Sequence, residues 1–167
     1  MSTRKVFYTE EQIRKMTQKI IVQMYNDNWR PDYIVGLTRG GLIPAVYLSH
    51  ALNIPMHTLK VSLRDHEDFE TNCWMATDAF GYEGTPKNIL IIDDINDTGA
   101  TLEWIVNDWQ SGCLPTDPEW DAVWGHNVRF AVLIDNLSSN FSYKVNYAAE
   151  EINKAEDDVW IVYPWEV

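Results

Sequence analysis

The stretch that decides the fold is residues 89–101, which read ILIIDDINDTGAT. Its first four residues form the most apolar run of the chain and predict a central strand of a parallel sheet, because such strands are buried on both faces. Three carboxylates, a threonine and a glycine follow, and helical spacing begins at Ala100. The stretch therefore combines a strand, a polar turn and a helix start, which is typical of layered α/β domains.

Helical and strand patterns alternate on both sides of this unit. A capping box at Thr9 predicts a helix to about Asn26, and a second helix is expected over 42–52. The helix that starts at Ala100 should end near Gly112. Apolar runs predict strands over 33–37, 55–62, 89–92, 128–134 and 159–163. These elements predict a three-layer α/β fold, with a mostly parallel sheet of about five strands flanked by helices.

Two long segments have no clear periodicity. Residues 63–86 mix acids, aromatic residues and glycines, and we expect a flexible lid there rather than a regular element. Residues 112–127 form a second irregular connection. Because chains of 167 residues seldom divide into two domains, residues 1–167 are expected to form one.

The composition narrows the possible ligands and surroundings. The chain has 13 Lys and Arg residues against 25 Asp and Glu residues, a formal net charge of −12. This balance disfavours nucleic acids and anionic membranes as partners. A phosphate ligand must therefore be bound by a few groups at one site rather than by a broad positive surface. Cys73 and Cys113 have no zinc-site or redox spacing. The polar N-terminus and the lack of a long apolar stretch lead us to expect a cytoplasmic protein.

The polar turn at residues 93–101 is the first candidate binding site. Backbone N–H groups at a helix start form an anion pocket that suits a phosphate monoester, and Thr98 and Thr101 add hydroxyl donors. Asp93 and Asp94 can accept hydrogen bonds from a sugar diol and can hold Mg²⁺, which prefers oxygen ligands. One loop could thus bind a phosphorylated sugar together with its metal.

This turn has two simpler interpretations. The spacing faintly resembles a calcium-binding EF-hand loop, but Ile105 stands where the bidentate glutamate should be, and a strand rather than a helix precedes the loop. Calcium is therefore rejected. A bare pair of aspartates is more often a solvated turn, but the nine-residue pattern is more specific than the pair.

A second polar strand end has the sequence Thr38-Arg39-Gly40-Gly41. It has neither the spacing of a Walker A loop nor the dinucleotide-binding glycine pattern. It is either a tight turn with a surface arginine or a second anion site. In the second case the glycines let the backbone approach a diphosphate, and Arg39 offers it a bidentate guanidinium.

Together these motifs resemble a known family. Residues 91–101 resemble the phosphoribosyl-diphosphate signature of type I phosphoribosyltransferases, and residues 38–41 resemble their pyrophosphate loop. The tail 158–166 is similar to the C-terminal segment of microbial xanthine-guanine and hypoxanthine enzymes. The resemblance implies a purine phosphoribosyltransferase that releases pyrophosphate from phosphoribosyl diphosphate. It also implies a small C-terminal hood over about 136–167.

The resemblance assigns roles to individual residues. It implies that phosphoribosyl diphosphate contacts Thr38, Arg39, Gly40, Gly41, Arg64, Asp93, Asp94, Thr98, Gly99, Ala100 and Thr101. It implies that the base contacts Asp97, Asn136, Trp160 and Ile161. Asp97 would act as general base, Trp160 would stack on the purine, and Asp93 and Asp94 would hold Mg²⁺ as the cofactor. A homo-oligomer is also expected.

Two features depart from the family pattern. A lysine usually reaches the 6-oxo group of the base from the strand end that corresponds to 133–137, but Asn136 stands there in this chain. The lid carries no Lys or Arg between Arg64 and Lys87, so Arg64 is either its diphosphate contact or a surface arginine balancing nearby acids.

Two other functions stay open at this point. One is a non-catalytic regulator that keeps the fold and senses phosphoribosyl diphosphate or binds RNA, although the sparse basic residues disfavour RNA. The other is a phosphoribosyltransferase for a different base, because Asn136 replaces the expected lysine.

Overall fold

The computed structural model describes residues 3–61, 73–82, 84–113 and 118–167. In chain order the elements are β1 (Arg4–Phe7), α1 (Glu10–Asn26), β2 (Tyr33–Thr38), α2 (Leu42–Leu52), β3 (Met56–Lys60), α3 (Cys73–Phe80), β4 (Ile89–Asn96), α4 (Ala100–Cys113), the 3₁₀ helix η1 (Pro118–Ala122), β5 (Val128–Asn136), β6 (Tyr147–Ile152), β7 (Val159–Val162) and the 3₁₀ helix η2 (Pro164–Glu166).

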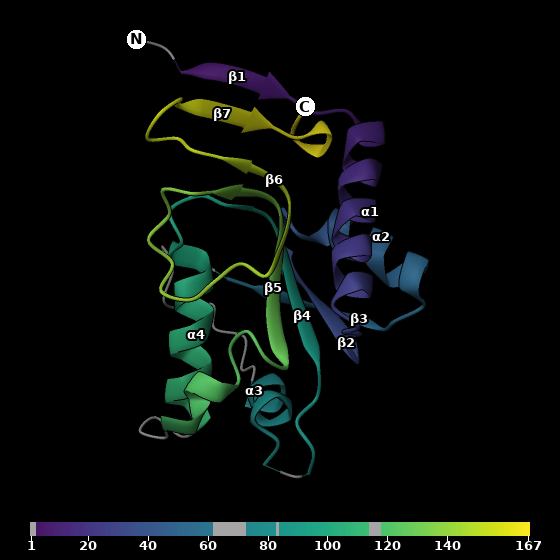
Figure 1. Cartoon of the computed structure of the whole chain (residues 1–167), viewed down its shortest axis with the longest axis vertical. Coiled ribbons are helices and arrows are strands. Elements are labelled where there is room, and N and C mark those ends of the chain that lie inside the picture. The colour runs from purple at the N-terminus through teal and green to yellow at the C-terminus, as the bar shows by residue number, and fades with distance from the viewer. Residues whose placement is uncertain (1–2, 62–72, 83, 114–117) are drawn as a thin grey trace.

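The main sheet has five parallel strands in the order β3-β2-β4-β5-β6. Helices α1 and α2 lie on one side of it, and α3 and α4 lie on the other (Figure 1). This arrangement confirms the predicted three-layer α/β fold. Because all five strands run in the same direction, their carboxyl ends meet at one edge, where ligands of such sheets bind.

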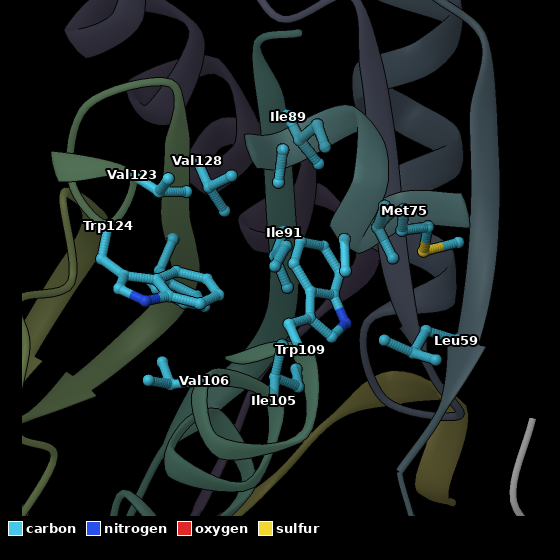
Figure 2. Close-up of a cluster of buried hydrophobic side chains, with 14 of the residues drawn as sticks. Leu59, Met75, Ile89, Ile91, Ile105, Val106, Trp109, Val123, Trp124 and Val128 are labelled. Carbon is cyan, nitrogen blue, oxygen red and sulfur yellow. The ribbon is translucent and has the colours of Figure 1, made fainter. Parts of the chain in front are cut away.

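The core follows from the alternation of side chains along β4. Ile89 and Ile91 pack with α4 residues such as Trp109 on one face, as the close-up of that cluster shows (Figure 2). Leu90 and Ile92 pack on the other face with residues of α1 and α2. All four of these β4 side chains are fully buried, so the strand is fixed between two apolar layers and its polar end projects from a rigid base.

A second, two-stranded sheet lies beyond the end of the main one. β7 occupies the strand predicted over 159–163, and it pairs in parallel with β1, from Arg4 opposite Val159 to Phe7 opposite Val162. Sequence reasoning missed β1 and also β6, which is the fifth strand of the main sheet. Neither has the apolar run of a buried strand.

The irregular segments contain more regular structure than expected. The prediction of no regular element over 63–86 is wrong, because α3 lies within it and buries Met75, Ala76 and Ala79 against the core. The earlier part of that segment, with Arg64, lies outside the described residues. α4 ends at Cys113, one residue after Gly112, near the predicted end.

The start of α1 matches the expectation. Thr9 is its N-cap, and Thr9 and Gln12 form the predicted capping box.

Within the described part of the chain, no helix combines the length and the apolar character needed to cross a lipid bilayer.

Candidate active site

The two polar strand ends meet at the carboxyl edge of β2 and β4. A Cβ atom added to Gly40 would collide with the Asp94 carboxylate, and one added to Gly41 would collide with the Ile92 carbonyl oxygen. The glycines are therefore required for the loop after β2 to lie directly on the end of β4. Arg39 is exposed on this loop, and no described residue hydrogen-bonds or ion-pairs with its guanidinium.

Asp93 and Asp94 place two adjacent carboxyl groups at the end of β4. Burial raises the pKa of Asp93 well above its usual range, and the neighbouring Asp94 charge raises it further. Burial is also the main cause that raises the pKa of Asp94. Each carboxylate accepts a local backbone N–H, from Asp94 to Asp93 at 2.9 Å and from Ile95 to Asp94 at 2.8 Å.

This pair fits a divalent cation better than it fits a purely structural role. Two neighbouring carboxylates without a cationic partner among the described residues leave negative charge uncompensated. Mg²⁺ is commonly bound by one or two carboxylates, with the remaining ligands supplied by water and substrate phosphates. The donor set of Asp93 and Asp94 matches this arrangement.

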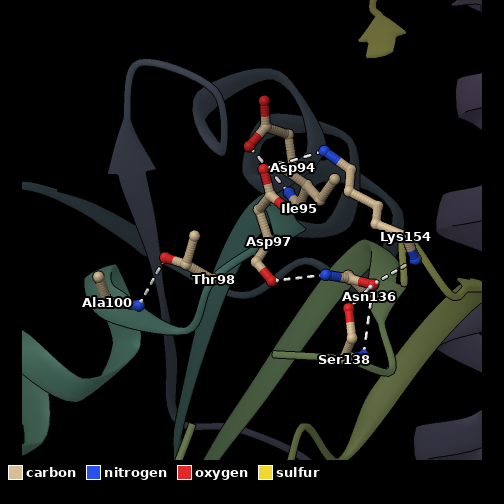
Figure 3. Close-up of polar contacts among 8 residues, drawn as sticks. All are labelled: Asp94, Ile95, Asp97, Thr98, Ala100, Asn136, Ser138 and Lys154. Carbon is tan, nitrogen blue, oxygen red and sulfur yellow. Dashed lines mark hydrogen bonds and ion pairs between the residues drawn. The ribbon is translucent and has the colours of Figure 1, made fainter. Parts of the chain in front are cut away.

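The loop at 97–101 forms the start of α4. Its first helical hydrogen bond runs from Glu103 N to Gly99 O at 3.0 Å, and Ala100 N donates to the Thr98 hydroxyl oxygen at 3.2 Å (Figure 3). The backbone N–H groups of Thr101 and Leu102 therefore have no helical acceptor. Gly99 has a φ of +95° and lies against Phe141, where a Cβ would collide with the backbone. Asn140 N donates to Thr98 O at 2.8 Å. The segment after β5 thus fixes the start of α4, and a helix start can receive an anion.

Asp97 lies beside a lysine that the sequence reasoning did not identify. Lys154 Nζ is 3.0 Å from Asp97 Oδ2, and the Lys154 side chain is only 16% exposed (Figure 3). The pair joins the end of β4 to the loop between β6 and β7. A cation is therefore present beside Asp97, although it comes from a different strand end than expected.

Asn136 connects these two residues through their backbones. Its Nδ2 donates to Asp97 O, and its Oδ1 accepts from Lys154 N, both at 2.9 Å (Figure 3). The same Oδ1 also accepts from the Ser138 hydroxyl at 3.0 Å. Asn136 is 5% exposed, so its amide positions its neighbours rather than standing open to a ligand.

Trp160 and Ile161 differ in exposure. The Trp160 side chain is 56% exposed and Lys154 Nζ lies 6.0 Å from its ring centroid, whereas Ile161 is buried. An exposed indole in a strand is available as a stacking surface, because core packing does not use its faces. Tyr163, two residues further on, donates to Asp94 O at 2.7 Å and so ties the hood to the end of β4.

One signal in the sequence could have identified Lys154. It is the only cation in residues 150–158, EEINKAEDD, which contain five acids. A lone lysine in such a stretch, shortly before Trp160, is a candidate for a specific anionic partner. Periodicity could not show that this partner is Asp97, because the two are 57 positions apart.

The domain combines an α/β sheet, an acidic strand end, a helix start and a glycine loop packed against that strand end. This combination is typical of enzymes that bind phosphorylated compounds at the carboxyl edge of the sheet. Comparison with known families makes the assignment specific. The phosphoribosyl transferase domain family matches residues 7–164. The chain belongs to this family.

Individual relatives are distant but cover most of the chain. Hypoxanthine-guanine phosphoribosyltransferase of Schizosaccharomyces pombe is 24% identical over 97% of this chain and 89% of its own length. Xanthine-guanine phosphoribosyltransferase of Cereibacter sphaeroides is 26% identical over 85% of this chain and 72% of its own. The crystal structure of purine phosphoribosyltransferase from Pyrococcus horikoshii superposes with a TM-score of 0.65 at 26% identity, covering 98% of this chain and 94% of that one.

Proposed function

We propose that the chain transfers the phosphoribosyl group from phosphoribosyl diphosphate to a 6-oxopurine and releases pyrophosphate. The observation that carries this proposal is the Asp97–Lys154 pair beside the exposed Trp160, next to the two acidic and anion-binding strand ends. The hypoxanthine-guanine and xanthine-guanine relatives support the choice of base class.

The phosphoribosyl part of the substrate would bind along the carboxyl edge of the main sheet. The backbone N–H groups of 98–101 would hold the 5′-phosphate, with Thr98 and Thr101 as hydroxyl donors. The loop 38–41 would hold the diphosphate, with Arg39 as its bidentate partner. Asp93 and Asp94 would accept hydrogen bonds from the ribose hydroxyls and hold Mg²⁺, which when bound neutralises the charge of the leaving diphosphate.

The chemical step needs a base nitrogen to replace the diphosphate oxygen on the ribose carbon. A C–N bond forms as the C–O bond breaks, and positive charge develops on the sugar. Asp97 would accept the proton that the purine loses, while Trp160 fixes the plane of the ring. The residues mainly position the reactants and neutralise charge.

Lys154 supplies the positive charge that Asn136 lacks. Its ammonium is held beside Asp97 and within reach of the Trp160 ring, where a stacked purine would present its 6-oxo group. A 6-oxopurine would accept a charge-assisted hydrogen bond from Lys154, whereas a 6-aminopurine would present a donor to it. Lys154 therefore favours oxopurines over adenine.

The direct test is pyrophosphate release with Mg²⁺, phosphoribosyl diphosphate and one base at a time: xanthine, guanine, hypoxanthine, adenine or orotate. Turnover with at least one oxopurine and none with orotate is expected. Binding of phosphoribosyl diphosphate without turnover of any base would replace the enzyme with a sensor of that ligand. Turnover of adenine or orotate alone would contradict the base class.

Substitution of Asp97 tests the chemical role separately from binding. Asp97→Asn is expected to lower kcat by about 10²–10⁴-fold, because a general base contributes on that order, and to change the affinity for phosphoribosyl diphosphate far less. Isothermal titration of the sugar diphosphate and steady-state kinetics measure the two effects. Equal losses in both would assign Asp97 to the sugar site instead.

A further inference from the structure

The two proposed substrates would be bound by residues of two different sheets. Trp160, the proposed platform for the base, lies on β7 of the two-stranded sheet, whereas Asp93 and Asp94 lie on β4 of the main sheet. Figure 1 shows the β1–β7 sheet beyond the carboxyl edge of the main sheet. The two sheets share no strand in the described part of the chain, so contacts other than strand pairing must set the distance between base and sugar.

Apolar packing holds the β1–β7 sheet against the rest of the domain. Val159 and Ile161 on β7 are buried in one cluster with residues of α1 such as Ile13. Hydrophobic burial is non-directional, so it favours contact between these surfaces without selecting one hydrogen-bonded arrangement. A directional contact is needed to fix β7 relative to β4.

Tyr163 makes such a contact directly after β7. Its side chain is 1% exposed, and its hydroxyl donates a hydrogen bond to Asp94 O at 2.7 Å. A phenylalanine ring would fill nearly the same space, but a buried hydroxyl needs a hydrogen-bond partner. The tyrosine hydroxyl therefore adds to the packing a bond with a defined direction and length.

The ring that carries this hydroxyl is itself fixed. It stacks on Trp165 with 4.7 Å between the ring centroids and 4° between the ring planes, and Tyr8 lies 6.1 Å away from it. The backbone at Tyr163 is closed by two bonds with Glu166, from Tyr163 N to Glu166 Oε1 at 2.9 Å and from Glu166 N to Tyr163 O at 3.0 Å. The hydroxyl is thus presented from a rigid base.

Asp94, which accepts this bond, also contacts the other parts of the proposed sugar site. Its carboxylate lies so close to Gly40 that a Cβ there would collide with it. Its backbone N–H donates to Asp93 Oδ1 at 2.9 Å. Tyr163 therefore connects β7 to the residue at which the glycine loop and the carboxylate pair meet.

Two other side-chain contacts cross between the same parts of the molecule. Lys154 contacts Asp97, but both are proposed to act on the base, so this contact must change during the reaction. The Tyr8 hydroxyl donates to Glu150 Oε2 at 2.6 Å, and Glu150 lies on β6, which carries no proposed substrate group. The Tyr163 contact, in contrast, reaches β4 and involves no group that reacts.

We propose that Tyr163 is a positioning residue, which sets the distance between a base on Trp160 and the ribose carbon of a sugar held at Asp93 and Asp94. The inference rests on the proposed function for the identity of the two substrates. Displacement of reactants by about 1 Å can lower a rate by roughly 10²-fold. A single hydrogen bond between the two sheets can therefore affect the chemical step.

Binding of inosine 5′-monophosphate tests this without any turnover, because this nucleotide would span both sheets. Hypoxanthine and ribose 5-phosphate are its two halves, and each would occupy one sheet. Tyr163→Phe keeps the ring and removes the hydroxyl. Isothermal titration should show a Kd for the nucleotide that is roughly 3- to 10-fold higher, which corresponds to one hydrogen bond. The Kd of each half should change by less than about twofold, because only the spanning ligand depends on how the two sites are placed.

Steady-state kinetics should show a kcat about tenfold lower in Tyr163→Phe, with both KM values close to wild type. Tyr33→Phe is the matched control. Tyr33 is also buried, at 6% exposed, and its hydroxyl donates to Asp78 Oδ2 at 2.9 Å, away from β7. This control should leave the nucleotide Kd and kcat unchanged, and urea midpoints show that both variants are folded.

An unchanged nucleotide Kd in the folded Tyr163→Phe variant overturns the proposal. An equal loss of affinity for ribose 5-phosphate or hypoxanthine also overturns it, because the hydroxyl would then act within one site. The same loss in Tyr8→Phe would overturn it as well, because general anchoring of the β1–β7 sheet would then set the distance. A wild-type chain that binds the nucleotide but turns over no oxopurine would contradict the proposed function alone, whereas one that does not bind the nucleotide would contradict both.

Discussion

Replacing Lys154 with methionine tests the base-recognition part of the proposed function. Methionine keeps much of the length of the side chain and removes its charge. The ammonium lost is 3.0 Å from Asp97 Oδ2 and 6.0 Å from the Trp160 ring centroid, so both a hydrogen-bond donor and a cation are removed from the base site.

The size of the effect follows from this environment. The Lys154 side chain is only 16% exposed, so water replaces its hydrogen bond poorly. A hydrogen bond to a charged group contributes about 1.5–3 kcal/mol, which corresponds to roughly a 10- to 150-fold loss of kcat/KM for an oxopurine. Asp97 stays 43% exposed and hydrated, so the variant should lose at most about 1 kcal/mol of stability.

The assay compares kcat/KM for the best oxopurine, the KM for phosphoribosyl diphosphate and the urea midpoint of unfolding. Lys154→Arg keeps the charge and should retain part of the activity. Lys15→Met removes a lysine that is 69% exposed on α1 and should leave all three quantities unchanged. A Lys154→Met variant with wild-type kcat/KM, or one that loses affinity for the sugar diphosphate instead, would refute the assignment of Lys154 to the base.

Three further substitutions test other parts of the site. Trp160→Ala should weaken base binding by about 1–3 kcal/mol without lowering the thermal midpoint, because the indole is 56% exposed and is proposed to stack on the base. Binding titrations measure the first effect and calorimetry measures the second. Gly41→Ala should cost about 1–3 kcal/mol in urea unfolding and abolish sugar-diphosphate binding, since its Cβ would collide with the Ile92 carbonyl; an unchanged urea midpoint would contradict that contact. Asp93→Asn should raise the metal-free thermal midpoint at neutral pH and eliminate turnover. Because the folded-state pKa of Asp93 is raised, the wild-type chain should lose stability relative to this variant as pH rises above about 4, where the unfolded carboxyl ionises, and Mg²⁺ should reduce the difference.

The sequence alone determined the layered fold and the strand ends that we propose as the sugar site. The apolar run 89–92 favours a strand covered on both faces, and its polar continuation starts a helix. These features are local, because strand, turn and helix start are set by neighbouring residues. For the same reason the helices at Glu10–Asn26 and Leu42–Leu52 were predicted nearly to the residue.

The elements that were missed lack such a local signal. β1 and β6 are held by pairing with β7 and β5, and their own residues are mostly partly exposed or exposed. Their strand conformation is stabilised by the neighbouring strand more than by apolar periodicity. α3 is short, and its apolar face becomes visible only when it packs against α4 and the sheet.

Only the tertiary structure decided which charges meet at the proposed base site. The Asp97–Lys154 pair joins positions 57 apart, and Tyr163 reaches the Asp94 carbonyl across 69 positions. Such contacts depend on how β5, β6 and β7 are placed in space, which no pattern of neighbouring residues encodes. The sequence therefore determined which strand ends carry the polar residues that we propose for phosphate and sugar, whereas the fold determined that the lysine beside Asp97 comes from the loop after β6.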